Sequence, residues 1–236
     1  MYKLRVKYGK FGILRFLSHL ETVRAFERAV RRANLPFALT KGFSPKLKIS
    51  WGPPLPLGFS SCAEYADFFL AGYLNPERII DSLNKALPRD IRILEAKYVP
   101  LHSASLMSII DVASYKTLIK VDPSLSREEL KDGMDGLLNR GRISVFKKDR
   151  ERAVDLRRLL LDFEVEEVKN GEVTLKFSLQ VGGKESIRPE NLIKALFERF
   201  PKSLSFEIIE ITRMSLYEKV GDELIDPLRI RKATSE

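Results

Sequence analysis

Residues 76–88, "PERIIDSLNKALP", and residues 189–201, "PENLIKALFERFP", follow the same pattern 113 positions apart. Both segments begin with Pro-Glu, carry apolar residues at matching positions and end in proline. Proline at the first helical position and apolar residues three and four apart predict an amphipathic helix in each segment. The matching pairs are Pro76 and Pro189, Glu77 and Glu190, Ile79 and Leu192, Ile80 and Ile193, Leu83 and Leu196, and Pro88 and Pro201. This repeat indicates an internal duplication, although Pro-Glu helix starts also arise independently.

The elements around the first of these helices have recognisable signals. Residues 2–8 alternate as a strand, and we expect residues 13–17 to extend it after a break at Gly9 and Gly12. Ser18 and Glu21 have the spacing of a capping box, which predicts a helix from Ser18 to just before Pro36. Residues 37–40, 46–51, 64–70 and 91–99 are predicted to be extended.

The second half contains the same kinds of element in the same order. Residues 115–121 predict a strand, and Ser126 with Glu129 predicts a capped helix to about Leu138. Residues 143–148 are expected to be extended. Asn170-Gly171 joins the predicted strands 159–168 and 172–181 with a hairpin signal, and a helix at 188–200 precedes a strand at 205–211.

Each half therefore has the order strand, helix, strand, strand, helix, strand, which is typical of ferredoxin-like domains. We predict an α+β protein of two tandem ferredoxin-like (βαββαβ) units, each with an antiparallel sheet and helices on one face. The predicted domains are residues 1–100 and 113–220, joined by a connection at 101–112. Residues 221–236 are expected to form a peripheral or partly disordered C-terminal tail.

Composition limits the classes of function. The chain has 236 residues, 44% of them apolar, and contains neither a run long enough to cross a membrane nor a secretion signal. We therefore expect a cytoplasmic protein with no membrane association. The single cysteine, Cys62, and the two histidines, His19 and His102, leave few ways to build a disulfide, a zinc site or an iron–sulfur cluster. No metal and no cofactor is expected.

The net charge of +9 is confined to the first half of the chain. Residues 1–100 hold 17 Lys and Arg against 8 Asp and Glu, whereas the remainder holds 24 against 24. Within residues 1–58 the count is 12 basic to 2 acidic. This asymmetry predicts a polyanionic partner, and the alternatives are a basic surface that serves solubility or the charge pattern of a thermophilic source.

The basic residues fall into two groups within one charge-rich segment. Four arginines lie on the polar face of the first predicted helix, and Lys46 and Lys48 lie on one side of residues 46–51 while Leu47, Ile49 and Trp51 lie on the other. The predicted RNA- or polyanion-binding residues are Arg15, Arg24, Arg28, Arg31, Arg32, Lys41, Lys46 and Lys48. Trp51 is predicted to be core, with base stacking by Trp51 or Phe43 as the alternative. The arginines could equally form a solvated helix face.

His19 is the one candidate for acid–base chemistry. It lies in the first turn of the predicted helix, where the helix dipole disfavours the protonated imidazole and leaves a neutral base. Tandem ferredoxin-like proteins include metal-independent ribonucleases that use a histidine, so an endoribonuclease is an alternative function. A histidine near a helix start is more often a hydrogen-bonding structural residue.

Residues 14–70, "LRFLSHLETVRAFERAVRRANLPFALTKGFSPKLKISWGPPLPLGFSSCAEYADFFL", resemble the signature of a bacterial family of unknown function linked to radical SAM enzymes. Members of that family stand alone or are fused behind a cobalamin-binding radical SAM protein. The resemblance extends over residues 2–100 and, less closely, to "VDLRRLL" and "SIRPENLIKAL" in the second half. This chain departs from the family pattern at Glu21, where aspartate is more frequent, and at Lys46-Leu47, where a His-Pro pair is more frequent.

The resemblance implies a partner rather than a reaction. Radical SAM chemistry needs a three-cysteine cluster motif, and this chain has one cysteine. We therefore predict a non-catalytic accessory or substrate-binding protein that works with a radical SAM enzyme of the cobalamin-binding type and binds RNA or another polyanion through its basic half. A pure protein–protein adaptor whose basic half docks on an acidic enzyme surface is a further alternative.

Overall fold

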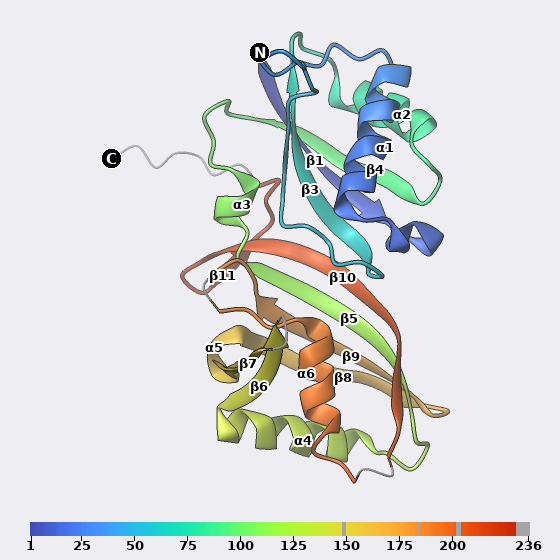
Figure 1. Ribbon diagram of the computed structural model, residues 1–236, viewed down its shortest axis with the longest axis vertical. Helices are drawn as coiled ribbons and strands as arrows, with labels where there is room; N and C mark the ends of the chain where they lie inside the picture. The colour runs from blue at the N-terminus through green and yellow to red at the C-terminus, as the bar shows by residue number, and fades with distance from the viewer. Residues whose placement is uncertain (148–149, 184, 202–203, 230–236) are drawn as a thin grey trace. The chain divides into compact units, whose positions relative to one another are not determined.

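The protein has a mixed α/β fold with mainly antiparallel strands (Figure 1). The computed structural model describes residues 1–147, 150–183, 185–201 and 204–229. The chain forms two compact units, one made of residues 1–110 with residues 215–229, and one made of the described residues of 111–214. Within the described ranges, no helix is long and apolar enough to cross a membrane.

Within residues 1–110 of the first unit, the strands have the order β4-β1-β3-β2. Its elements are β1 (Tyr2–Lys10), the 3-10 helix η1 (Gly12–Phe16), α1 (His19–Arg32), β2 (Ile49–Trp51), β3 (Ser60–Leu70), α2 (Pro76–Ala86), β4 (Ile91–Val99) and α3 (Leu106–Ile109). The pairs β1–β3, β1–β4 and β2–β3 are antiparallel, and Leu4 lies opposite Phe68 on one side and Tyr98 on the other. Residues 37 and 39 add isolated bridges to Leu70 and Leu47.

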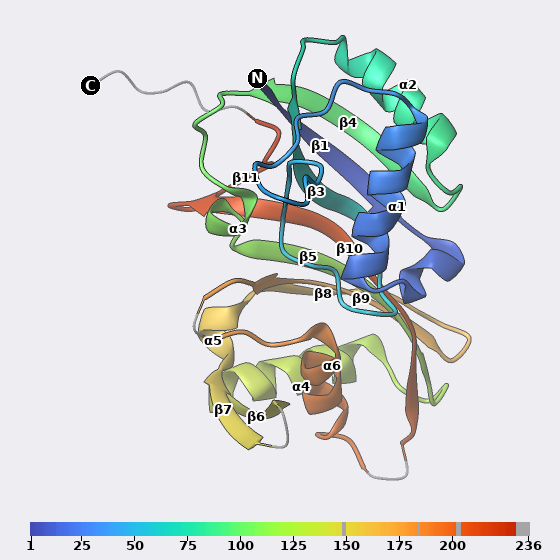
Figure 2. The same ribbon diagram turned by 45° about the horizontal axis from the view of Figure 1, so that its top comes forward.

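Helices α1 and α2 cover one face of this sheet (Figures 1 and 2). Alternate residues of β1 and β3 point toward them, so Leu4, Val6 and Phe68 join the helical residues Phe26 and Ile79 in a buried core. The capping box is present, since the Ser18 hydroxyl accepts from the Glu21 amide and the Glu21 carboxylate accepts from the Ser18 amide. Helix α1 therefore begins where the sequence predicts.

The opposite face of the sheet holds a buried charge network. Asp67, which is 0% exposed, accepts from Arg5 Nε at 2.7 Å and Nη2 at 3.0 Å and pairs with Lys3 Nζ at 3.1 Å. Arg5 also donates to the carbonyls of Ala104 and Pro227, and Lys3 donates to the carbonyl and hydroxyl of Ser103. The network therefore ties the segment after β4 and the C-terminal segment to the centre of the sheet.

The C-terminal segment of the first unit is folded as far as Arg229, which corrects the predicted peripheral tail at 221–236. Strand β11 (Glu223–Ile225) pairs with the end of β10 (Phe206–Val220). Asp226 then accepts from Tyr65 at 3.1 Å and from Lys7 at 3.4 Å, and Leu228 is buried. Burial and the neighbouring Asp226 carboxylate raise the pKa of Tyr65. Residues 230–236 of the predicted tail lie outside the described residues.

The second unit has the strand order β10-β5-β9-β8. Its other elements are β5 (Val112–Val121), α4 (Arg127–Arg140), β6 (Arg142–Lys147), β7 (Arg150–Asp155), α5 (Leu156–Leu159), β8 (Leu160–Lys169), β9 (Glu172–Gln180) and α6 (Pro189–Phe197). Helices α4 and α6 lie on one face of these strands (Figure 2). The predicted capping box of Ser126 and Glu129 is present. Asn170 and Gly171 both have positive φ, as the two-residue hairpin requires.

Two predicted strands differ in the structure. Residues 12–16 form η1, because Gly12 has a φ of 54° that ends the extended path of β1. Residues 142–147 pair only with residues 150–155 in a separate two-stranded sheet. Strand β7, "RERAVD", was not predicted because its charges obscure the alternation; Lys148, the last residue of the predicted segment 143–148, lies outside the described residues.

Candidate nucleic-acid interface

The exposed face of α1 is lined with arginine. Its inner face buries Thr22, Phe26, Ala29 and Val30 against the sheet. Arg24, Arg28 and Arg31 are exposed and spaced by four and three residues, so they lie on one side of the helix. The amphipathic pattern that packs the helix thus also fixes where these side chains point.

The arginines of α1 differ in what they already contact. Arg32 donates to the carbonyl of Ala86 at 2.6 Å and so caps the C-terminus of α2. Arg24 interacts electrostatically with Glu21. The pKa of Glu21 is lowered chiefly by its hydrogen bonds to Ser18 and further by the positive charge of Arg24. In the part of the chain that the structure describes, the side chains of Arg28 and Arg31 make no hydrogen bond and no ion pair. Their charges are available to an external ligand.

The contacts of Arg15 differ from those of the arginines of α1. It lies in η1, half-buried, with its guanidinium 4.9 Å from the centre of the Phe16 ring. Its carbonyl accepts from the amide of Gly58 at 2.9 Å, which holds the end of the proline-rich segment 53–58 against η1. Arg15 is therefore a structural contact of that segment as well as a cation near the start of α1.

The predicted lysine residues lie on a hairpin formed by residues 37–48, which we call the lysine hairpin. The Thr40 amide donates to the Lys46 carbonyl at 2.8 Å, and the Lys46 amide donates to the Thr40 hydroxyl at 3.0 Å. The Lys48 amide donates to the Ala38 carbonyl at 2.8 Å. These bonds close a tip of residues 41–45, where Lys41 is exposed and Phe43 is fully exposed. Lys46 is exposed at its base.

The arginine face and Lys48 lie on opposite sides of the sheet. Phe68 packs against Phe26 of α1, with ring centroids 5.9 Å apart. Phe69, the next residue of the strand, therefore points to the other face, and Lys48 Nζ lies 4.6 Å from the centre of its ring. The structure therefore places the two predicted basic groups on α1 and on the lysine hairpin, with Lys48 on the sheet face opposite α1.

Trp51 lies at the edge of the core and not on the surface. It makes edge-on ring contacts with Tyr8, Phe26 and Phe68, at centroid distances of 6.1, 5.2 and 6.4 Å. Leu47 and Ile49 also pack against the core, as the alternation of residues 46–51 predicts. Base stacking at this hairpin is therefore open to Phe43 and not to Trp51.

His19 lines a small cavity beside the start of α1. The cavity has a volume of about 10 Å³ and is also lined by Tyr8, Lys10, Thr22, Leu55 and Glu64. Glu64 accepts from the Ser61 hydroxyl at 2.6 Å, and Lys10 donates to the Leu17 carbonyl at 2.9 Å. A space of this size holds about one water molecule and no nucleotide. The geometry therefore favours a structural role for His19.

Burial is the main cause that lowers the pKa of His19, and Lys10 lowers it further while Glu64 opposes the shift. The unfolded chain thus takes up a proton first as the pH falls through His19's ordinary pKa of 6.5. We expect stability to fall below that pH, and to fall less in a His19→Gln variant. Thermal unfolding of both proteins between pH 7.5 and 5 measures this difference; parallel profiles would contradict it.

The carboxylates of Glu64 and Asp67 on β3 have separate partners in Ser61 and Arg5. Within the described ranges, no group of three or more His, Cys, Asp or Glu residues could hold a metal ion.

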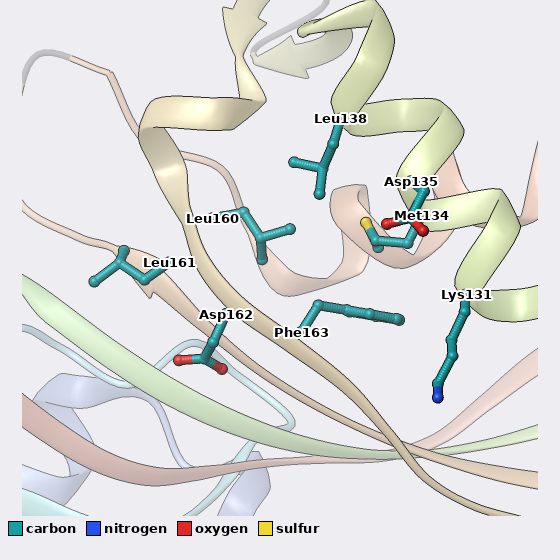
Figure 3. A pocket seen from close by; sticks show the side chains of 8 residues that line it. All are labelled: Lys131, Met134, Asp135, Leu138, Leu160, Leu161, Asp162 and Phe163. Carbon is teal, nitrogen blue, oxygen red and sulfur yellow. The ribbon is translucent and has the colours of Figure 1, made fainter.

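The second unit has a cavity of about 280 Å³ between α4 and β8 (Figure 3). Met134 and Leu138 from α4 point toward Leu160 and Phe163 from β8, and Asp162 points away from them. The lining is mixed, with apolar side chains beside the charged residues Lys131, Asp135 and Asp162. Two carboxylates and one amine do not favour a polyanion, so this cavity is distinct from the predicted surface.

Residues 3–189 match a family described as an uncharacterized protein conserved in bacteria, DUF2344. The chain belongs to this family. No curated protein matches the chain.

Several solved structures resemble the DUF2344 chain in fold. A chain in the crystal structure of a Cbf5-Nop10-Gar1 complex matches 90% of it with a TM-score of 0.52 and 13% identity. A chain in the structure of an H/ACA RNP bound to a substrate RNA containing 2′-deoxyuridine matches 90% of it with a TM-score of 0.50 and 11% identity. The DUF2344 chain spans 48% and 46% of these two chains, about half of their length. At such low identity the likeness concerns the fold alone.

Proposed function

We propose that this protein is a non-catalytic accessory protein that binds RNA, or another polyanion, through the exposed face of α1. The observation that carries the proposal is the position of Arg28 and Arg31, which are exposed on one side of α1 and make no hydrogen bond or ion pair within the described residues. Cations held on a rigid helix at this spacing contact successive phosphates without reading base sequence.

The proposed partner is a radical SAM enzyme of the cobalamin-binding type, in the cytoplasm. The resemblance of residues 14–70 to radical-SAM-linked proteins supports this partner. With Cys62 as its only cysteine, the chain cannot bind a three-cysteine cluster by itself. The cluster chemistry would therefore belong to the enzyme, and this protein would present or retain the substrate.

We also infer that the two units are tandem ferredoxin-like units. The strands β1, β2, β3 and β4 of the first unit and β5, β8, β9 and β10 of the second can each be numbered 1 to 4 along the chain. With this numbering both β4-β1-β3-β2 and β10-β5-β9-β8 have the order 4-1-3-2. In each unit the helices come after the first and third of these strands. The equivalent places of α2 and α6, whose sequences match 113 residues apart, support a duplication.

A titration of RNA binding against salt tests the proposed function. With the purified protein and a fluorescein-labelled RNA of about 20 nucleotides, we expect the logarithm of the association constant to fall linearly with the logarithm of salt concentration. One phosphate contact each from Arg24, Arg28 and Arg31 corresponds to a slope of roughly −2, since each contact on a single strand contributes about −0.7. Fluorescence anisotropy measures the slope.

Three outcomes separate this proposal from the ribonuclease and adaptor alternatives. Binding that is absent, or unaffected by salt, would contradict the proposal. Cleavage of the RNA in the presence of EDTA that disappears in His19→Ala would support a ribonuclease instead. Co-purification with the radical SAM enzyme without any RNA affinity would support a protein adaptor.

A further inference from the structure

The tip of the lysine hairpin holds an aromatic ring in solvent. Phe43 is the most exposed of the large apolar side chains within the described residues. Gly42 allows the tip a φ of 137° that other residues rarely adopt, and the ring of Pro45 fixes its own φ. The two hydrogen bonds between Thr40 and Lys46 close its base. The ring is thus displayed by a closed turn rather than by a free chain end.

Cations flank this ring on both strands of the hairpin. Lys41 and Lys46 are exposed on either side of the tip. Lys48 follows at the end of the hairpin, and its ammonium lies over the ring of Phe69 in β3. No ion pair in the described part of the chain involves these three lysines. An exposed aromatic ring between unpaired cations is complementary to a ligand that has a flat apolar face and a phosphate on each side.

We propose that Phe43 stacks on an unpaired nucleobase, so that the lysine hairpin selects single-stranded over double-stranded nucleic acid. This inference rests on the proposed function and names its substrate class. In a duplex both faces of each base are covered by stacking, whereas an unpaired base offers a face to an aromatic side chain. The lysines hold the phosphates beside that base, and the arginines of α1 add affinity that is indifferent to pairing.

An anionic membrane is the other ligand that an aromatic ring among lysines could meet. Membrane attachment needs a large apolar area. The tip offers only one large apolar side chain, because its other residues are Lys41, Gly42, Ser44 and Pro45. A single ring is sufficient for one base and too small for stable attachment to a bilayer, so the structure favours the nucleobase.

The inference is tested with a Phe43→Leu variant, which keeps an apolar side chain and removes the aromatic face. We expect its affinity for a 12-nucleotide single-stranded RNA to fall roughly tenfold, with no change in affinity for the 12-base-pair duplex of the same sequence. Phe43→Trp should retain single-strand affinity. Phe16→Leu is the matched control, since Phe16 is also an exposed phenylalanine of the first unit but lies in η1 and not in the lysine hairpin. It should bind as the wild type does.

Each other outcome is decisive. Equal losses on single strand and duplex, no loss in Phe43→Leu, or an equal loss in Phe16→Leu would overturn the stacking role. The role would also be overturned if Phe43→Leu mainly reduced co-sedimentation with vesicles of phosphatidylcholine and phosphatidylserine. If the wild type binds both RNAs and Phe43 is without effect, this inference alone fails. If the wild type binds neither RNA, the proposed function fails with it.

Discussion

Replacement of Asp67 by alanine is expected to lower the free energy of unfolding by about 3–5 kcal/mol. The Asp67 carboxylate is fully buried and is the anion that neutralises both Arg5 and Lys3, which are also buried. Its removal leaves two cations in the interior that keep hydrogen bonds to carbonyls and one hydroxyl but lose their carboxylate. Urea unfolding followed by circular dichroism measures the loss.

Asp81, which is exposed on α2, is the matched control for this experiment. Asp81→Ala should change the free energy of unfolding by less than about 0.5 kcal/mol. A double variant, Arg5→Met with Asp67→Leu, removes both partners of the strongest pair and should cost less than the sum of the single variants. If Asp67→Ala unfolds like the wild type, the buried network does not stabilise this unit.

The four longer helices, α1, α2, α4 and α6, could be predicted because their signals are local, whereas η1, α3 and α5 were not predicted. Ser18 with Glu21, Ser126 with Glu129, and Asn75 before Pro76 each satisfy helix amides within one turn, and the structure has a helix start at each of them. The Asn170-Gly171 turn is local in the same sense. The exposed arginine face of α1 follows from the same periodicity.

What the sequence could not reveal depends on contacts between distant segments. Lys3 and Arg5 alternate with apolar residues in β1, a pattern typical of a strand with one face in water, and both belong to the 12 basic residues counted within residues 1–58. The structure buries both, because Ser103, Ala104 and Pro227 come from about 100 and 222 residues away to cover that face. The effective basic surface is smaller than the formal charge indicates.

The two faces of residues 37–51 illustrate the same limit within one segment. Alternation correctly placed Trp51 with the core. It gave no indication that the chain reverses at residues 41–45, which leaves Phe43 exposed. Gly42 and Pro45 were a turn signal that could have located this tip.

The largest expected effect on binding comes from reversing the charge of the two unpaired arginines of α1. An Arg28→Glu/Arg31→Glu variant should bind single-stranded RNA about 10- to 30-fold more weakly at moderate salt, since each lost surface contact is worth on the order of 1 kcal/mol. The slope of affinity against salt should become shallower by about 1.4, because two phosphate contacts are lost. Anisotropy titrations at several salt concentrations give both values.

Two further variants make this result specific to α1. Lys131→Glu/Arg140→Glu changes the net charge equally on the exposed residues of α4 and should leave the affinity nearly unchanged. Arg28→Gln/Arg31→Gln removes the contacts without adding repulsion and should lose less affinity with the same change in slope, because slope counts contacts. Near-equal losses in the α1 and α4 charge reversals would mean that total charge, and not the face of α1, binds the RNA. Wild-type affinity in both charge-reversal variants would mean that the RNA does not bind at α1.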